Sequence, residues 1–315
     1  MTQKPQPMQT FSAEQVHAAL PWPALVAQLA QAFAHGAEVP VRHAHKLGQT
    51  DALLLMPAWS SDAIGVKLVT VMPGNASRNA ATVQATYLLL ERATGRMLAM
   101  LDGESLTLRR TAAASVLAAR YLARPDARQL LIVGSGHLAG WMARAYHALR
   151  PELAQIAVWG RNPHASAALT RVLADEGLPM QVCENLQKGV QAADIVCCVT
   201  TSHTPVVLGQ WLQPGTHLDL VGAFKPDMRE TDDAAVAGSR VFVDTFAGAL
   251  AEAGDLVQPL RAGTIKRAHV LGEMAQLVRQ QIAGRQSAQE ITLFKSVGTA
   301  LEDLAAARMV LAAHR

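Results

Sequence analysis

The sequence predicts an α/β protein in which a doubly wound parallel-sheet domain accompanies a discontinuous α+β domain. Three observations support this prediction: a buried apolar strand that leads into a glycine-rich turn and a helix, apolar runs that alternate with helical segments after it, and antiparallel strand patterns before it. The chain has 315 residues, of which 50% are apolar and 17% charged. This length and composition suffice for two hydrophobic cores.

The chain opens with helix signals. Ser12 is followed three residues later by Gln15, as in a capping box, and Pro23 suits the first turn of a second helix that reaches His35. Strand patterns follow, and Thr94-Gly95 supplies the turn of a hairpin. The strands that we expect here are Ala52–Met56, Ile64–Val71, Thr82–Glu91 and Arg96–Leu101.

An alanine-rich helix is predicted over Ser105–Leu122, and the break at Ala123–Asp126 marks a change of pattern. Short apolar strands alternating with helices then predict a parallel sheet. The final stretch, Ile291–Leu311, reads as a strand and a helix that return to the first domain. We therefore expect a substrate-binding and dimerisation domain at residues 1–124 and 290–315, and a dinucleotide-binding domain at residues 125–289.

The glycine-rich turn is the main sequence signal for a cofactor. The strand Leu130–Val133 runs directly into Gly134-Ser135-Gly136-His137-Leu138-Ala139, which matches Gly-x-Gly-x-x-Ala. The first glycine permits the tight turn, the second lets a pyrophosphate approach the backbone, and the alanine allows close helix packing. This context indicates a Rossmann-type domain that binds a nicotinamide dinucleotide.

The end of the second parallel strand bears on which dinucleotide is bound. Trp159-Gly160 is followed by Arg161-Asn162, where an NAD-dependent protein usually carries an acidic residue for the ribose 2′-hydroxyl. A guanidinium pairs well with a 2′-phosphate, so NADPH is predicted, with NADH as the weaker alternative. Thr200 and Val221-Gly222 follow later strands and are expected to line the same crevice.

The first domain carries three candidate substrate-binding cations, Arg42, Lys67 and Arg110. Lys67 lies inside an apolar strand, and a charge on a buried strand face needs an anionic partner. A substrate carboxylate would be such a partner. The pattern also fits an ordinary exposed strand lysine, so from the residues alone both interpretations stay open.

Several ordered motifs resemble the ornithine cyclodeaminase/μ-crystallin family. They are Gly65–Val71 with Pro73-Gly74-Asn75, Arg110–Ser115, Gly222-Ala223 with Pro226 and Arg229-Glu230, and Phe294–Gly298. The resemblance implies a homodimer in which Arg42, Lys67 and Arg110 bind the substrate carboxylate and Thr82 lies near the nicotinamide. The expected cofactor-binding residues are Thr82, Arg110, Gly134, Ser135, Gly136, His137, Leu138, Arg161, Thr200, Val221 and Gly298, and Lys67 is the candidate catalytic residue.

One position departs from the cyclodeaminases of this family. They carry an aspartate in a Gly-Gly-Asp-x-Pro pattern, where this chain has Phe224 before Lys225-Pro226. The sequence is instead similar to the ketimine reductases, which implies reduction of Δ1-pyrroline-2-carboxylate to proline and of Δ1-piperideine-2-carboxylate to pipecolate. The alternatives are a cyclodeaminase, an amino-acid dehydrogenase, and a non-catalytic protein that binds NADPH.

Other classes are disfavoured. The net charge is +3 with scattered basic residues, which does not suggest nucleic-acid binding. The histidines and the three cysteines lack metal-ligand spacing, so no metal is expected and the cysteines are interpreted as buried thiols. The absence of long apolar runs predicts a cytoplasmic protein without a membrane partner.

Overall fold

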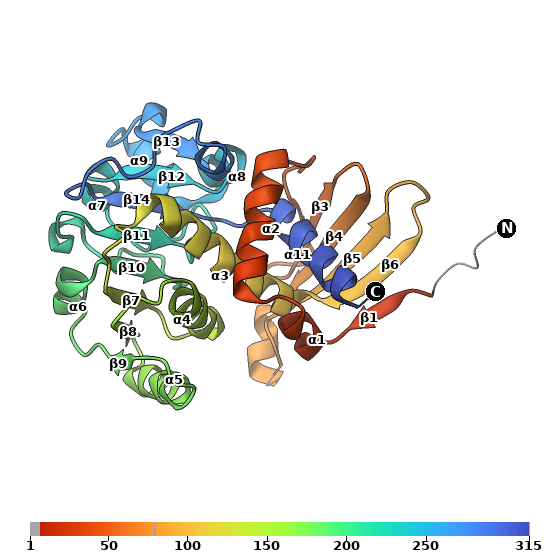
Figure 1. Ribbon diagram of the computed structural model, residues 1–315, viewed down its shortest axis with the longest axis horizontal. Helices are drawn as coiled ribbons and strands as arrows, with labels where there is room; N and C mark the ends of the chain where they lie inside the picture. Colours follow the sequence, from red (N-terminus) through yellow and green to blue (C-terminus); the bar gives the residue numbers. More distant parts are fainter. Residues whose placement is uncertain (1–6, 79, 315) are drawn as a thin grey trace. The chain divides into compact units, whose positions relative to one another are not determined.

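The computed structural model describes residues 7–78 and 80–314, and the chain forms two compact units. The first unit consists of the residues up to Thr111 together with those from Thr299 onward, and the second is Ala112–Gly298 (Figure 1). Each unit is built around one β-sheet. The predicted fold class, a doubly wound parallel sheet with a discontinuous α+β partner, is confirmed.

The first unit contains a six-stranded sheet in the order β1-β6-β5-β4-β3-β2. Its strands are β1 (Gln9–Phe11), β2 (His43–Lys46), β3 (Ala52–Trp59), β4 (Ala63–Val71), β5 (Val83–Glu91) and β6 (Met97–Asp102). Neighbouring strands are antiparallel except for β1, which pairs with β6 in parallel. The predicted hairpin joins β5 to β6, and Gly95 adopts a left-handed φ of 72° in its turn.

Helices cover one face of this sheet. They are α1 (Ala13–Ala18), α2 (Trp22–His35) and α11 (Ala300–Ala313), and Figure 1 shows α2 and α11 beside each other over the strands. The capping box of Ser12 and Gln15 at α1 is present as predicted, and a proline occupies the first turn of α2. A short 3-10 helix, η1 (Pro73–Arg78), connects β4 to β5.

The residues of β4 alternate strictly between the two faces of the sheet. Ala63, Gly65, Lys67 and Val69 are buried, whereas the residues between them are only partly covered. A strand with period-two burial has one face against a core and one face open. Lys67 thus lies on the covered side, with the apolar residues.

The second unit contains an eight-stranded sheet in the order β13-β12-β14-β11-β10-β7-β8-β9, and all its pairings are parallel. Its strands are β7 (Gln129–Val133), β8 (Gln155–Trp159), β9 (Met180–Val182), β10 (Ile195–Cys198), β11 (His217–Leu220), β12 (Arg240–Val243), β13 (Val270–Glu273) and β14 (Thr292–Lys295). From β7 the chain adds β8 and β9 on one side and then places β10 on the other. Ligands of doubly wound sheets bind at this reversal, beyond the carboxyl ends of the strands.

Helices lie on both faces of the parallel sheet. Figure 1 shows α4 and α5 on one side and α6 and α7 on the other. The helices of this unit are α4 (His137–Leu149), α5 (Pro163–Asp175), α6 (Leu186–Ala192), α7 (Asp233–Ala237), α8 (Phe246–Glu252), α9 (Gly254–Ala262) and α10 (Met274–Val278), with the 3-10 turns η2 (Gly209–Trp211) and η3 (Arg267–His269).

The unit boundaries differ from those expected at residues 124/125 and 289/290. Strand β14 pairs with β11 and β12 inside the parallel sheet, so the expectation that the chain leaves that sheet before Ile291 was wrong. All four residues of β14 are buried, which is typical of a central parallel strand. At the other boundary, α3 (Gly103–Leu122) belongs to the first unit up to Thr111 and to the second beyond it, so the break after Leu122 ends a helix rather than a domain.

Candidate active site

The glycine-rich turn has the geometry of a dinucleotide-binding loop. Gly134 has a φ of 121°, and a Cβ there would lie 2.9 Å from the carbonyl oxygen of Val199, so a side chain would be both strained and obstructed. Gly136 is the N-cap of α4, without a side-chain cap, and a Cβ on it would meet open space. The α4 N-terminus therefore offers backbone N–H groups and room for a pyrophosphate.

The neighbouring residues of the loop have different exposures. Ser135 and Leu138 are partly buried, whereas His137 is exposed at the start of α4. Ala139 is fully buried, as close packing of the helix requires. The glycines of the turn and the buried Ala139 therefore fit the binding of a dinucleotide at this loop.

The loop after β8 places Arg161 in solvent near this turn. A Cβ on Gly160 would lie 2.7 Å from the Ser135 hydroxyl oxygen, so the loops after β7 and β8 approach each other closely. Asn162 caps α5 by accepting hydrogen bonds from the N–H groups of His164 and Ala165. Asn162 is thereby occupied, whereas Arg161 is exposed at the end of the second strand.

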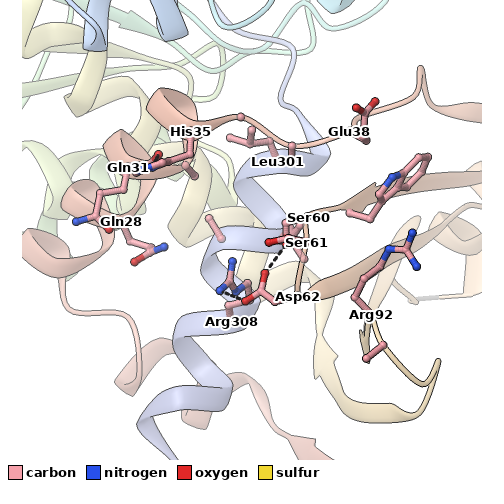
Figure 2. A pocket seen from close by; sticks show the side chains of 17 residues that line it. Gln28, Gln31, His35, Glu38, Ser60, Ser61, Asp62, Arg92, Leu301 and Arg308 are labelled. Atoms are coloured by element: carbon pink, nitrogen blue, oxygen red, sulfur yellow. Dashed lines mark hydrogen bonds and ion pairs between the residues drawn. The ribbon is translucent and has the colours of Figure 1, made fainter.

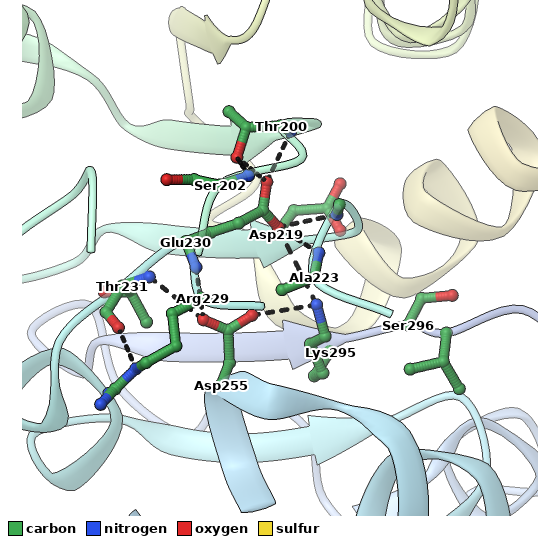
Figure 3. Close-up of polar contacts among 12 residues, drawn as sticks. Thr200, Ser202, Asp219, Ala223, Arg229, Glu230, Thr231, Asp255, Lys295 and Ser296 are labelled. Atoms are coloured by element: carbon green, nitrogen blue, oxygen red, sulfur yellow. Dashed lines mark hydrogen bonds and ion pairs between the residues drawn. The ribbon is translucent and has the colours of Figure 1, made fainter. Parts of the chain in front are cut away.

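A buried carboxylate joins the loops that follow β10 and β11 (Figure 3). Glu230 is fully buried, and its Oε1 accepts hydrogen bonds from the N–H and hydroxyl of Thr200 at 2.6 and 3.0 Å. Its Oε2 accepts from the N–H groups of Gly222 and Ala223 at 2.7 and 3.2 Å. One side chain thus fixes both strand ends beyond the sheet reversal.

Lys295 supplies the cation of this cluster from the end of β14. Its Nζ lies 3.0 Å from Asp255 Oδ2 and 3.9 Å from Glu230 Oε2, and all three side chains are fully buried. Asp255 in turn accepts from the N–H groups of Glu230 and Thr231. Burial raises the pKa of Glu230 to about 7, and the Lys295 ammonium opposes this rise.

Val221 and Gly298 are both buried in this unit. Val221 lies directly after β11 and donates its N–H to the carbonyl of Cys198. Gly298 has a φ of 77°, and its N–H is bound by Asp244 Oδ2 at 2.8 Å. The carboxylate of Asp244 also accepts the N–H of Val297, so it holds the turn after β14 in place.

Two of the three predicted cations of the first unit, Lys67 and Arg110, converge on carboxylates of the C-terminal helix. Lys67 Nζ lies 2.8 Å from Asp303 Oδ2 and donates to the Thr107 hydroxyl at 3.2 Å. Arg110 Nε donates to Asp303 Oδ1 at 2.9 Å, and Arg110 Nη1 to Glu302 Oε2 at 2.7 Å. Lys67 and Arg110 are 3% and 5% exposed, and both carboxylates are fully buried.

The ion pair with Asp303 overturns the argument that Lys67 needs a substrate carboxylate as its anionic partner. The lysine is buried rather than an ordinary exposed strand residue, but Asp303 already supplies its anionic partner. The charges of Lys67 and Arg110 are paired with carboxylates of the protein, but some of their N–H donors are not used by the described residues. Within residues 7–78 and 80–314, one Lys67 ammonium hydrogen and the Arg110 Nη2 group have no protein acceptor.

The pKa values follow from burial and these partners. Burial lowers the pKa of Lys67 to about 8; Asp303 opposes the shift, and Arg110 and Arg42 add to it. Burial alone would raise the pKa of Asp303, but Lys67 and Arg110 outweigh it and lower that pKa. Lys67 thus titrates close to physiological pH.

The other predicted residues of the first unit are more exposed. Arg42 is partly exposed and lies near enough to influence Lys67 electrostatically. Thr82 is exposed before β5 and accepts the N–H of Met72 through its carbonyl. In the second unit, Phe224 is 38% exposed, and Lys225 Nζ lies 5.9 Å from the centre of its ring. A phenyl ring therefore stands where the cyclodeaminases carry their aspartate.

Sequence reasoning missed Glu302 and Asp303, which lie in the first turn of α11. The available signal was an adjacent acidic pair in a mostly apolar helix, since buried charges need partners. It also missed that Glu230 and Lys295, recognised only as parts of motifs, form one buried cluster. Of the cysteines, Cys197 and Cys198 are buried as expected, whereas Cys183 is partly exposed.

A cavity of the first unit lies apart from these residues (Figure 2). It has a volume of about 1300 Å³ and is lined by residues of α2, α11 and the β3–β4 turn, including Trp59, Asp62 and Arg308. None of the predicted site residues lines it. Among the described residues, no His, Cys, Asp and Glu side chains form a group suited to a metal ion, and no helix is long and apolar enough to span a membrane.

Fold and site together define a two-unit protein with a dinucleotide-binding unit. The chain belongs to the ornithine cyclodeaminase/mu-crystallin family, whose model matches residues 10–314, and the resemblance seen in the sequence is confirmed.

Three relatives are similar over most of the chain. It is 42% identical to a Delta(1)-pyrroline-2-carboxylate reductase of Paracoccus denitrificans, over 81% of each chain. It is 35% identical to the protein of the same name from Colwellia psychrerythraea, covering 96% of this chain and 98% of the relative. The structure of Thermococcus litoralis Delta(1)-pyrroline-2-carboxylate reductase, in complex with NADH and L-proline, superposes with a TM-score of 0.92 at 32% identity, covering 97% of each chain.

Proposed function

We propose that this protein is an NADPH-dependent ketimine reductase that converts Δ1-pyrroline-2-carboxylate to proline and Δ1-piperideine-2-carboxylate to pipecolate. The observation that carries the proposal is the buried pair Lys67 and Arg110, which retains unused donors for a carboxylate in a chain that also has a dinucleotide-binding loop. Three relatives similar over most of the chain bear the name of the pyrroline reductase. The enzyme class is an oxidoreductase that uses a nicotinamide cofactor and acts on C=N bonds.

In this proposal each unit binds one reactant. The loop Gly134–Leu138 and the α4 N-terminus hold the pyrophosphate, and Arg161 holds the 2′-phosphate. We propose that Thr200, Val221 and Gly298 contribute to the rest of the dinucleotide site, and that Thr82 and Arg110 contribute to binding of the nicotinamide end. The bound nicotinamide supplies a hydride for the imine carbon.

The carboxylate of the imine is held by Lys67, Arg110 and Arg42. Charge-assisted hydrogen bonds of this kind fix orientation as well as affinity. The protonated imine is the better hydride acceptor, and a second role that we propose for Lys67 is to keep or return that proton. We propose a cytoplasmic location and a role in proline metabolism.

Phe224 argues against the cyclodeaminase alternative. Removal of an amino group from ornithine needs a base near the reacting carbon, and a phenyl ring accepts no proton. The same site without that carboxylate still serves hydride transfer to an imine that is already formed.

The test is NADPH oxidation with each cyclic imine, followed by absorbance, beside parallel assays with NADH. We expect turnover of both imines, because the one methylene that separates the two rings changes pocket binding by only about 1 to 3 kcal/mol. We also expect a preference for NADPH over NADH, because Arg161 can pair with the 2′-phosphate. Ammonia release from ornithine would instead favour the cyclodeaminase. Tight NADPH binding without turnover of either imine would favour a non-catalytic binding protein.

A further inference from the structure

Asp303 occupies the centre of the cationic cluster of the first unit. It reaches Lys67 with one carboxylate oxygen, at 2.8 Å, and Arg110 with the other, at 2.9 Å. The three residues come from three different elements, β4, α3 and α11. A single carboxylate therefore sets the spacing between the two cations.

Glu302 is the natural comparison, since it is adjacent in the chain and equally buried. It contacts Arg110 at 2.7 Å, but no contact joins it to Lys67. The two carboxylates thus differ within the cluster: both contact the guanidinium of Arg110, and of the two Asp303 is the one that contacts the ammonium of Lys67. This difference supplies a control variant of the same charge and burial.

The surroundings of Lys67 otherwise favour its neutral form. The charged and titratable groups that influence or neighbour it are Asp303 on α11, Arg110 on α3, Arg42 before β2 and Tyr87, its cross-strand neighbour on β5. Two of these are cations, Tyr87 is a neutral phenol, and burial itself disfavours the ammonium. Asp303 is the one group among them that stabilises the charge.

We propose that Asp303 is a positioning residue of the substrate site, which holds Lys67 charged and beside Arg110 so that the remaining donors of both face one carboxylate of the substrate. This inference rests on the proposed function, in which these cations bind the imine carboxylate. Asp303 itself need not touch the substrate. Its action is on the charge and position of Lys67.

The test measures binding of pyrrole-2-carboxylate to the NADPH-loaded enzyme across the pH range, because this carboxylate does not titrate near pH 8. In the wild-type protein affinity should fall as pH rises through about 8, where Lys67 loses its proton. Asp303→Asn should move that midpoint down by about one pH unit or more, since an opposite charge at this distance shifts a pKa by about 1 to 3 units. Glu302→Gln should leave the midpoint in place, and Asp303→Glu should restore it.

A midpoint in Asp303→Asn equal to that of the wild type, with folding intact, overturns the inference. An equal shift of the midpoint in Glu302→Gln also overturns it, because the shift would then come from the loss of any nearby negative charge and not from the contact of Asp303 with Lys67. If Asp303→Asn does not fold, the double variant Lys67→Met/Asp303→Asn decides. Removing both charges should restore a folded protein, and a double variant that is equally unfolded contradicts the coupling. Absence of imine turnover by the wild-type enzyme is a separate result and concerns the proposed function.

Discussion

At the scale of single residues, burial makes Lys67 and Arg161 opposite cases. Lys67 is enclosed, paired and shifted in pKa, so its replacement disturbs both charge and packing. Arg161 is exposed and is held by its position at a strand end. Neither state follows from the residue type. The pattern located both residues, but only the three-dimensional structure distinguishes the buried cation from the solvated one.

Lys67→Met should raise the KM for the imine carboxylates by roughly 10- to 100-fold, because a charge-assisted hydrogen bond contributes about 1.5 to 3 kcal/mol. The measurement is steady-state kinetics with NADPH saturating, beside a thermal melt. Lys46→Met is the matched control, since Lys46 is an exposed lysine on β2 of the same sheet. An unchanged KM in a folded Lys67→Met protein removes Lys67 from the substrate site.

Arg161→Gln should reduce kcat/KM for NADPH by about 10-fold or more and leave that for NADH nearly unchanged, because only the 2′-phosphate loses its partner. The ratio of the two values is the readout. Arg171→Gln changes another exposed arginine, on α5, and should leave the ratio intact. Equal losses with both cofactors would argue that Arg161 does not recognise the 2′-phosphate.

At the scale of elements, local signals predicted most helices and strands, and long-range pairing accounts for what they missed. The capping box at Ser12 and the glycine-rich turn at Gly134 are short-range patterns, so the sequence alone located them. Strand β14 was assigned to the wrong unit because its partners β11 and β12 lie far away in the chain. The ion pair of Lys67 with Asp303 escaped prediction for the same reason.

Lys295→Met should destabilise the second unit by about 3 to 5 kcal/mol, because it leaves Glu230 and Asp255 buried without their cation. The loss should depend on pH. The pKa of Glu230 is raised from 4.5 to about 7 in the folded state, so its contribution to stability is present below 4.5 and is lost as pH rises through 7. Without Lys295 that pKa rises further.

Thermal melts of Lys295→Met and the wild type at pH 5 and pH 8 measure this effect, and the difference in Tm should be larger at pH 8. Lys266→Met, at an exposed lysine of the same unit, should melt as the wild type does at both values. A loss in Tm that is independent of pH would mean that packing, and not the carboxylates, dominates.

At the scale of the whole molecule, the sheet of the first unit has a second face that none of the described helices of that unit covers. The register places Pro57, Val66, Leu88 and Met100 in one row across four strands, and all four are partly exposed and apolar. Apolar patches on a protein surface can mark interaction sites. Two copies related by a twofold axis would cover it with the same residues from each chain. We therefore propose a homodimer through this face.

Val66→Glu should convert that dimer to a monomer. A glutamate at the centre of the row would bury one charge from each copy, at a cost of at least about 3 kcal/mol, which corresponds to roughly a hundredfold rise in Kd. Light scattering on a sizing column gives the mass directly. Val172→Glu, on the exposed side of α5, is the control and should remain dimeric. A wild-type monomer, or a Val66→Glu dimer of undiminished stability, would place the subunit contact elsewhere or remove it.

Because the face belongs to the unit that carries Lys67 on its opposite side, loss of the dimer should also weaken imine binding more than NADPH binding.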